Sequence, residues 1–234
     1  MTQTPGTTAD ATAKADDPRG RILDGFLALL SERSFERIGL SDVATRAGVS
    51  LAELRAAFGS TFDMLSTFIR DVDRKVLAGV AAEGDEAMAD QPARDRVFDV
   101  VMRRLDVLAP HKDALRSLLK SVRRNPFFAL ALNKQAVRSA QWMLAAAKID
   151  TAGLKGAARA QGLALVQARV LETFLRDEDP GLAKTMSVLD RELAKGERAL
   201  GLLGNLCVLA TCGGRRAERA APYAGPAPQE PAAA

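Results

Sequence analysis

Ser50 and Glu53 stand three residues apart in the segment LSDVATRAGVSLAELRAAF, residues 40–58. This spacing predicts a capping box, in which each side chain accepts a hydrogen bond from the other residue's backbone N–H at the start of a helix. Gly48 lies just before them, where a tight turn between two helices needs a positive φ. Leu54 and Phe58 would share one buried face. The segment therefore predicts a helix-turn-helix that presents the first turn of its second helix to a DNA major groove, although an ordinary αα-hairpin would need the same caps and the same glycine.

Positive charge is the second feature that bears on nucleic-acid binding. Residues 18–78 hold nine basic and eight acidic residues, which is a small surplus for a domain that must neutralise phosphates. Arg19 and Arg21, at the start of the first helix, are the additional phosphate contacts that we expect. A larger surplus, nine basic against four acidic residues, occurs in 94–124. It indicates a solvated helix face or, alternatively, attraction to an acidic membrane surface or an anionic ligand.

No catalytic constellation is visible in the sequence. His111 is the only histidine, so triads and metal sites that depend on several histidines are excluded. The glycines at 201 and 204 lack the Lys-Ser/Thr that follows in a phosphate-binding loop. Cys207 and Cys212 are too few for a disulfide framework. We expect no enzymatic activity, no metal and no cofactor.

The periodicity predicts an all-α chain of about nine helices. Five prolines stand at expected helix starts, after Asp17, Gln91, Ala109, Asn125 and Asp179, and Asp and Asn are also good helix caps. No segment alternates with the period of two that a strand requires. The expected helices cover 18–34, 41–47, 51–57, 61–82, 92–108, 111–124, 126–147, 155–177 and 181–203. The domain layout that follows is a disordered arm at 1–17, a three-helix helix-turn-helix domain at 18–65, a helical bundle at 66–210 and a disordered Ala/Pro-rich tail at 211–234.

Composition favours a cytoplasmic location. Hydrophobic residues make up 47% and charged residues 26% of the 234 residues, which is ordinary for a soluble domain. No window holds the roughly 18 apolar residues of a membrane span, and the N-terminus lacks the apolar core of a secretory signal. In the helical bundle, methionine and aromatic side chains with few buried polar groups would suit a small apolar or aromatic effector. The pocket residues that we expect are Met102, Leu105, Leu118, Phe127, Phe128, Trp142, Met143 and Phe174.

The N-terminal quarter resembles the TetR/AcrR-like regulators. The matching residues are Ile22 to Phe35, Ser41 to Ala44, Ala47 to Ser50, Leu54, Phe58, Ser60 and Leu65. The resemblance implies a DNA-binding head, an all-helical ligand-binding body and a homodimer on palindromic operator DNA. The DNA-contacting positions that it implies are Ser41, Ser50, Leu51, Ala52, Glu53, Arg55 and Thr61.

Several of these positions depart from the family pattern. Leu51 replaces the usual lysine, Ala52-Glu53 replaces Gly-Thr, and Thr61 replaces a second lysine. Arg55 stands where a tyrosine normally touches the DNA backbone, and its guanidinium suits phosphate. Glu53 instead places a negative charge near phosphates.

Dimerisation is expected through the helices at about 155–177 and 181–203. The second of these helices carries an apolar seam with a 4-3-4-3 spacing, as in helix bundles. The seam consists of residues 182, 186, 189, 193, 196, 200 and 203. Packing within one chain would use the same seam. Residues 168–180, with Thr185 and 189–192, also resemble TetR-fold lipid-binding accessory proteins of ubiquinone biosynthesis. This second resemblance implies an alternative function, a lipid-binding protein that has lost specific DNA binding.

Overall fold

The structure, a computed structural model, describes residues 17–84 and 90–199. Within these ranges the chain forms helices and no strand, which confirms the all-α prediction. The predicted N-terminal arm up to residue 16, the C-terminal tail, positions 200 and 203 of the apolar seam, and both cysteines lie outside the described residues. Contacts divide the chain into two units, residues 1–196 and residues 197–234.

Three helices form the N-terminal head: α2 (Pro18–Glu32), α3 (Leu40–Ala47) and α4 (Leu51–Ala57), with a short 3-10 helix η1 (Phe35–Arg37) after α2. Asp17 caps α2, because its carboxylate accepts a 3.0 Å hydrogen bond from the Arg19 backbone N–H. Helix α2 ends two residues earlier than predicted, at an extended Arg33. Gly25 lets α3 approach α2 closely, since a Cβ there would lie 3.3 Å from the Ala47 backbone nitrogen. The core of the head is made by Ile22, Phe26, Leu29, Leu30, Val43, Leu54 and Phe58.

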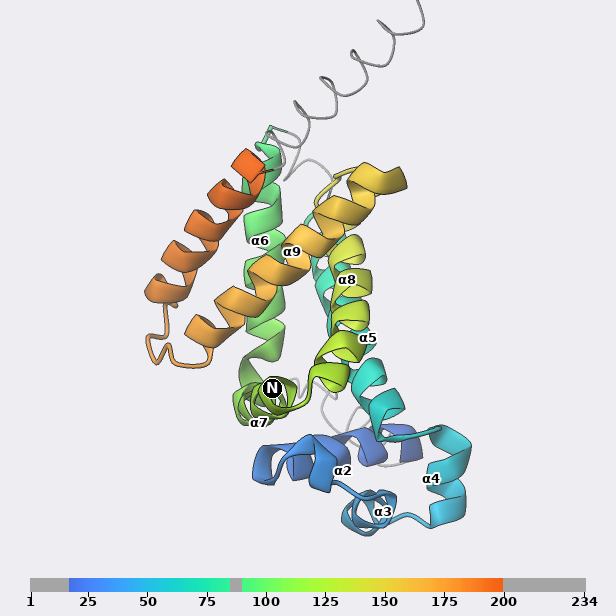
Figure 1. The fold of residues 1–234 in the computed structure, drawn as a ribbon. Helices are drawn as coiled ribbons and strands as arrows, with labels where there is room; N and C mark the ends of the chain where they lie inside the picture. The colour runs from blue at the N-terminus through green and yellow to red at the C-terminus, as the bar shows by residue number, and fades with distance from the viewer. Residues whose placement is uncertain (1–16, 85–89, 200–234) are drawn as a thin grey trace, which may run out of the picture. The chain divides into compact units, whose positions relative to one another are not determined.

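The body is a bundle of α5 (Thr61–Glu83), α6 (Ala93–Leu108), α7 (Lys112–Arg124), α8 (Pro126–Ala146), α9 (Gly153–Phe174) and a helix over 183–199, with the 3-10 helix η3 (Ala109–His111) before α7. Figure 1 shows α5 leaving the head and running up into the bundle beside α8. Asn125 caps α8, as predicted, by accepting a hydrogen bond from the Phe128 N–H at 3.0 Å. Pro110 instead lies in η3, so α7 begins after it.

The largest difference from the predicted boundaries lies between α9 and the following helix. Helix α9 ends at Phe174 and not at 177, and the next helix begins at 183 and not at 181. The cause is a set of long-range bonds: Arg116 of α7 donates to the Leu175 carbonyl oxygen at 2.7 Å and 3.2 Å, and the buried Asp177 accepts from the Thr185 N–H at 2.9 Å. Pro180 therefore lies in the turn and does not start a helix.

Helix α7 connects the body to the head through side-chain hydrogen bonds. Ser121, which is fully buried, accepts a 3.1 Å hydrogen bond from the Phe35 N–H and donates to Glu36 Oε2 at 2.9 Å. Ser117, one turn earlier, donates to the Arg33 carbonyl oxygen at 2.7 Å. The loop after α2 is thus held by side chains of the body, because its backbone groups would otherwise be buried without partners.

Candidate DNA-binding surface and ligand cavity

The turn between α3 and α4 has the geometry of a helix-turn-helix. Gly48 adopts the left-handed conformation with φ 64° and ψ 39°, as predicted, and the Val49 N–H donates to the Ala44 carbonyl oxygen at 3.0 Å. The predicted capping box is present, because Ser50 Oγ accepts from the Glu53 N–H at 3.2 Å and Glu53 Oε2 accepts from the Ser50 N–H at 2.8 Å. These bonds fix the start of α4 and leave its first turn at the surface.

Most of the predicted DNA-contacting side chains lie on the exposed side of the head. They are Ser41, Ser50, Leu51, Ala52, Glu53 and Arg55, with Thr61 half-buried at the start of α5. Leu51 is the most unusual of them, since its side chain is 54% exposed although it is apolar. The first turn of α4 thus presents one large apolar side chain, one small one and one carboxylate.

Some arginine side chains of the head bind other residues of the fold, whereas others are exposed to solvent. Arg19 donates to the Ala57 carbonyl oxygen at 2.7 Å and covers the Phe58 ring at 4.4 Å, so its guanidinium holds α2 against the end of α4. Arg46 forms a two-pronged pair with Glu32 at 2.7 Å and 2.8 Å. Arg21, Arg37 and Arg55 are exposed and make no side-chain hydrogen bond or ion pair within the described residues. Arg37 was not among the predicted contacts, because no local motif distinguishes it from other surface arginines.

Glu53 stays ionised on this surface. The backbone N–H of Ser50, together with its hydroxyl and the nearby charge of Arg21, lowers the pKa of the Glu53 carboxyl. Its negative charge therefore persists at neutral pH beside any bound phosphate. The same carboxylate caps α4, so the first turn of this helix keeps a negative charge at the surface.

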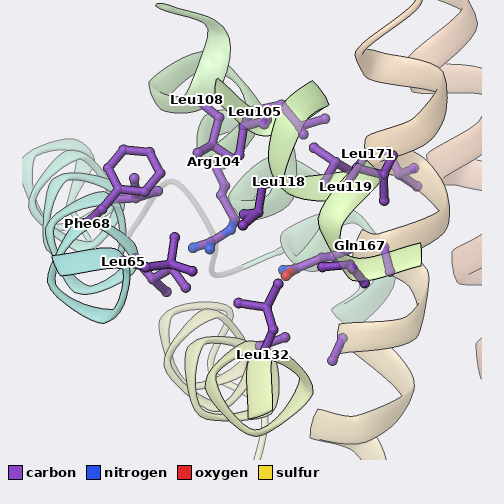
Figure 2. A pocket seen from close by; sticks show the side chains of 18 of the residues that line it. Leu65, Phe68, Arg104, Leu105, Leu108, Leu118, Leu119, Leu132, Gln167 and Leu171 are labelled. Atoms are coloured by element: carbon purple, nitrogen blue, oxygen red, sulfur yellow. The ribbon is translucent and has the colours of Figure 1, made fainter. Parts of the chain in front are cut away.

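An apolar cavity of about 200 Å³ lies inside the body. Helices α5 to α9 all contribute to its wall, which consists mostly of leucine, valine and alanine side chains. Figure 2 shows the leucines Leu65, Leu105, Leu118 and Leu132 around it, with Arg104 and Gln167 as the polar groups of the wall. A cavity of this kind suits a small apolar ligand.

The predicted pocket residues are only partly in this wall. Leu105 and Leu118 line the cavity. Phe128, Met143 and Phe174 are buried in the core, and Met102 is half-buried, but none of these four is in the wall. Phe127 and Trp142 are surface residues, 84% and 59% exposed. Trp142 lines a second pocket, which Asp73 and Ser139 also line.

A buried ion pair borders the cavity. Arg104 of α6 pairs with Asp73 of α5, and their side chains are only 12% and 9% exposed. Ser139 of α8 donates to Asp73 Oδ1 at 2.6 Å. No sequence pattern identifies Asp73, Ser139 and Gln167 as residues of this region, because a single polar residue inside an apolar helix carries no local signal of what it faces.

Most basic side chains of the segment 94–124 form hydrogen bonds or ion pairs with other residues of the fold. Arg94 pairs with Asp190 at 2.5 Å, Arg123 pairs with Glu172 at 2.7 Å, and Lys112 donates to the Asp177 carbonyl oxygen at 2.8 Å. Arg96, Arg103, Arg104 and Arg116 also make hydrogen bonds or ion pairs. The charge surplus of this segment is thus used mainly to bind α6 and α7 to their neighbours.

His111 is half-buried and lies beside the cavity. Its ring meets Phe68, a cavity residue, edge-on with centroids 5.0 Å apart. Burial and the charge of Lys75 lower the pKa of His111, so the imidazole is neutral at pH 7. Among the described residues no group of histidine, cysteine and acidic side chains is arranged to bind a metal ion.

The two helices expected to form a dimer interface keep apolar groups at the surface. Leu154 and Leu165 of α9 are 88% and 50% exposed, and Met186 is 36% exposed. Leu189, by contrast, is completely buried, so the seam of the last helix also packs within the chain. None of the described helices is long and apolar enough to span a membrane.

Comparison with known proteins assigns the fold. No protein-family model and no curated protein matches this chain. The structure resembles that of a TetR transcriptional regulator from Nitrosomonas europaea ATCC 19718, with a TM-score of 0.59 and 24% identity over 77% of this chain and 99% of that one. It also resembles a TetR transcriptional regulator from Rhodococcus sp. RHA1, with a TM-score of 0.53 and 20% identity over 76% of this chain and 95% of the other. The chain therefore has a TetR-like fold, a helix-turn-helix head on an all-helical body, as the sequence predicted.

Proposed function

We propose that this protein is a DNA-binding transcriptional regulator, a repressor that a small apolar effector releases from its operator. The observation that carries the proposal is the helix-turn-helix itself: a capped α4 whose first turn is exposed at the end of the head. A helix presented this way enters the major groove with its N-terminal residues against the base edges. Ser50, Leu51 and Ala52 would read bases, and Arg21 and Arg55 would bind phosphates.

The proposed active form is a homodimer on a palindromic operator. The apolar side chains that α9 and the last helix keep exposed, Leu154, Leu165 and Met186, support contact between two copies. A two-fold dimer would place two α4 helices in successive major grooves about 34 Å apart. This activity requires access to the chromosome, which is why we propose a cytoplasmic location.

Helix α5 supports the proposed coupling between effector and DNA. Its first residue, Thr61, follows α4 after three residues, and the same helix contributes Leu65, Phe68 and Val72 to the cavity wall. A ligand that changes the packing of α5 would change the orientation of α4. An enzymatic role is not proposed, because the described residues offer the cavity no nucleophile or general base.

A lipid-binding accessory protein without DNA binding is the second candidate. The exposed Leu51 and the ionised Glu53 at the first turn of α4 favour it, because neither binds phosphate. The contacts of Arg19 with Ala57 and Phe58 also favour it, because they hold within the fold a guanidinium that we expected to bind phosphate. This candidate predicts that an acyl or isoprenoid lipid copurifies with the protein and that the protein binds liposomes.

Capture of sheared genomic DNA on the purified protein, followed by sequencing, separates the two candidates. A regulator enriches one palindrome at near-physiological salt, and the Arg21→Ala/Arg55→Ala variant loses the enrichment while keeping its fold. Recovery without sequence preference that disappears with modest salt contradicts the proposal. In that case, extraction of the protein for bound lipid tests the second candidate.

A further inference from the structure

We infer that the cavity binds a small neutral molecule with one hydrogen-bond-accepting oxygen, such as an aryl or alkyl ketone, and discriminates against the carboxylate of the same shape. This inference deepens the proposed function, because it specifies the chemistry of the effector. The inference rests on two polar residues in an otherwise apolar wall. The amide nitrogen of Gln167 has no hydrogen-bond partner among the described residues, and the charge of Arg104 is neutralised by Asp73.

Gln167 provides the hydrogen-bond donor. Its Nε2 atom is buried and has no hydrogen-bond partner among the described residues. Figure 2 shows the side chain extending from α9 toward the interior of the cavity, near Leu132. A buried donor without a partner destabilises the empty protein, so a ligand oxygen that accepts from it gains that free energy on binding.

Arg104 determines the charge that the ligand can carry. Its guanidinium is already paired with Asp73, and Asp73 also accepts from Ser139. The cation that the described residues place in the wall is therefore compensated by a buried carboxylate. A ligand carboxylate would have to enter this low-dielectric space without a counter-charge, which is far more costly than the entry of a neutral carbonyl.

The size of the cavity suits a single ring or a short chain. Its volume is about 200 Å³. An apolar cavity of about 150 Å³ holds benzene. The remaining space fits a few additional heavy atoms, including the carbonyl group that faces Gln167.

Three probes of nine heavy atoms and nearly equal shape test this inference. They are acetophenone with a carbonyl oxygen, α-methylstyrene with a methylene in its place, and benzoate with a charged carboxylate. Each is titrated into methyl-labelled full-length protein without DNA. The ¹³C-methyl chemical shifts of the cavity leucines report both the site and the dissociation constant.

In the wild-type protein we expect acetophenone to bind about five- to tenfold more tightly than α-methylstyrene, the effect of one neutral hydrogen bond. Benzoate should be the weakest of the three by at least about tenfold. In Gln167→Leu the preference for acetophenone over α-methylstyrene should fall to about one. Gln141→Leu, at an exposed glutamine of α8, is the matched control and should keep the wild-type order.

Equal binding of the two neutral probes to the wild-type protein overturns the inference, and so does tighter binding of benzoate or binding of none of the three. These wild-type ratios need no variant, so a folding defect in Gln167→Leu cannot obscure them. DNA is absent from the experiment. A failure of the inference is therefore distinct from a failure of the proposed DNA binding, which the genomic capture measures separately.

Discussion

Phe35 and Phe128 stack face to face, with ring centroids 4.5 Å apart and ring planes inclined by 20°. Phe35 belongs to the loop after α2 in the head, and Phe128 belongs to the first turn of α8 in the body. Phe26 meets Phe35 edge-on at 6.3 Å, and Phe62 of α5 meets Phe128 edge-on at 6.2 Å. The four rings join the head, α5 and α8 in one aromatic cluster, so a movement of α5 or α8 would displace the rings of the head.

Removal of a ring from this cluster should destabilise the protein strongly. Phe128 is 8% exposed, and Phe128→Ala is expected to lower the free energy of unfolding by about 3–5 kcal/mol, because it leaves a cavity and removes two ring contacts. Urea denaturation measures the loss. The adjacent Phe127 is 84% exposed, and Phe127→Ala, the matched control, should change stability by no more than about 0.5 kcal/mol. Similar losses for both variants would contradict the assignment of Phe128 to the head–body contact.

Arg55 is expected to bind a phosphate. Arg55→Ala should weaken binding to specific and non-specific DNA alike, and the slope of log K against log salt should become shallower by about 0.9 for the lost contact. Fluorescence anisotropy over a range of salt concentrations measures both quantities. Arg74→Ala is the control, because Arg74 is an exposed arginine of α5 that pairs with Asp71. A slope that is unchanged in Arg55→Ala would exclude this residue as a phosphate contact.

The Asp73–Arg104 pair should show strong coupling in a double-mutant cycle. Asp73→Leu or Arg104→Met alone leaves one buried charge without its partner, and each is expected to cost about 3–5 kcal/mol of unfolding free energy. The double variant removes both charges and should be much more stable than the sum of the single losses predicts. Chemical denaturation of all four proteins measures the coupling. Additive losses would show that the two side chains do not stabilise each other.

Asp177 should stabilise the folded protein only at pH values at which its carboxyl is ionised. The hydroxyl of Thr185, at 2.7 Å, is the main cause that lowers the pKa of Asp177, and the N–H groups of Thr185 and Asp179 also lower it while burial opposes them. Because its folded-state pKa is below its unfolded-state pKa, this stabilisation is present above the ordinary aspartate value of about 3.9 and is lost as the pH falls through the folded-state pKa.

Thermal unfolding of Asp177→Asn alongside the wild type tests this pH dependence. The variant should be less stable at a pH of about 6, and the difference should shrink as the pH falls below the ordinary aspartate value of about 3.9 and through the folded-state pKa, where the wild-type carboxyl becomes protonated. A difference that is the same at both ends of this range would mean that ionisation of Asp177 does not stabilise the turn after α9.

The sequence by itself determined the features that depend on neighbours within one helical turn. The capping box of Ser50 and Glu53, the left-handed Gly48, and the caps Asp17 and Asn125 were all predicted correctly. Their partners lie two to four residues away, so residue types and spacing suffice to predict the hydrogen bonds. The same local patterns predicted the bounds of α4 without error and those of α5 within one residue.

Only the tertiary structure decided which of these side chains are available for function. Arg19 and Arg55 are equally plausible phosphate ligands in the sequence. In the fold, however, Arg19 donates to the Ala57 carbonyl oxygen and covers the Phe58 ring. Phe127 and Phe128 are adjacent and identical in type, yet the direction of α8 exposes one and buries the other. The end of α9 and the lining of the cavity by Arg104 and Gln167 likewise depend on residues from distant helices. Burial and long-range pairing are properties of the packed chain, because they arise only when helices far apart in the sequence come together.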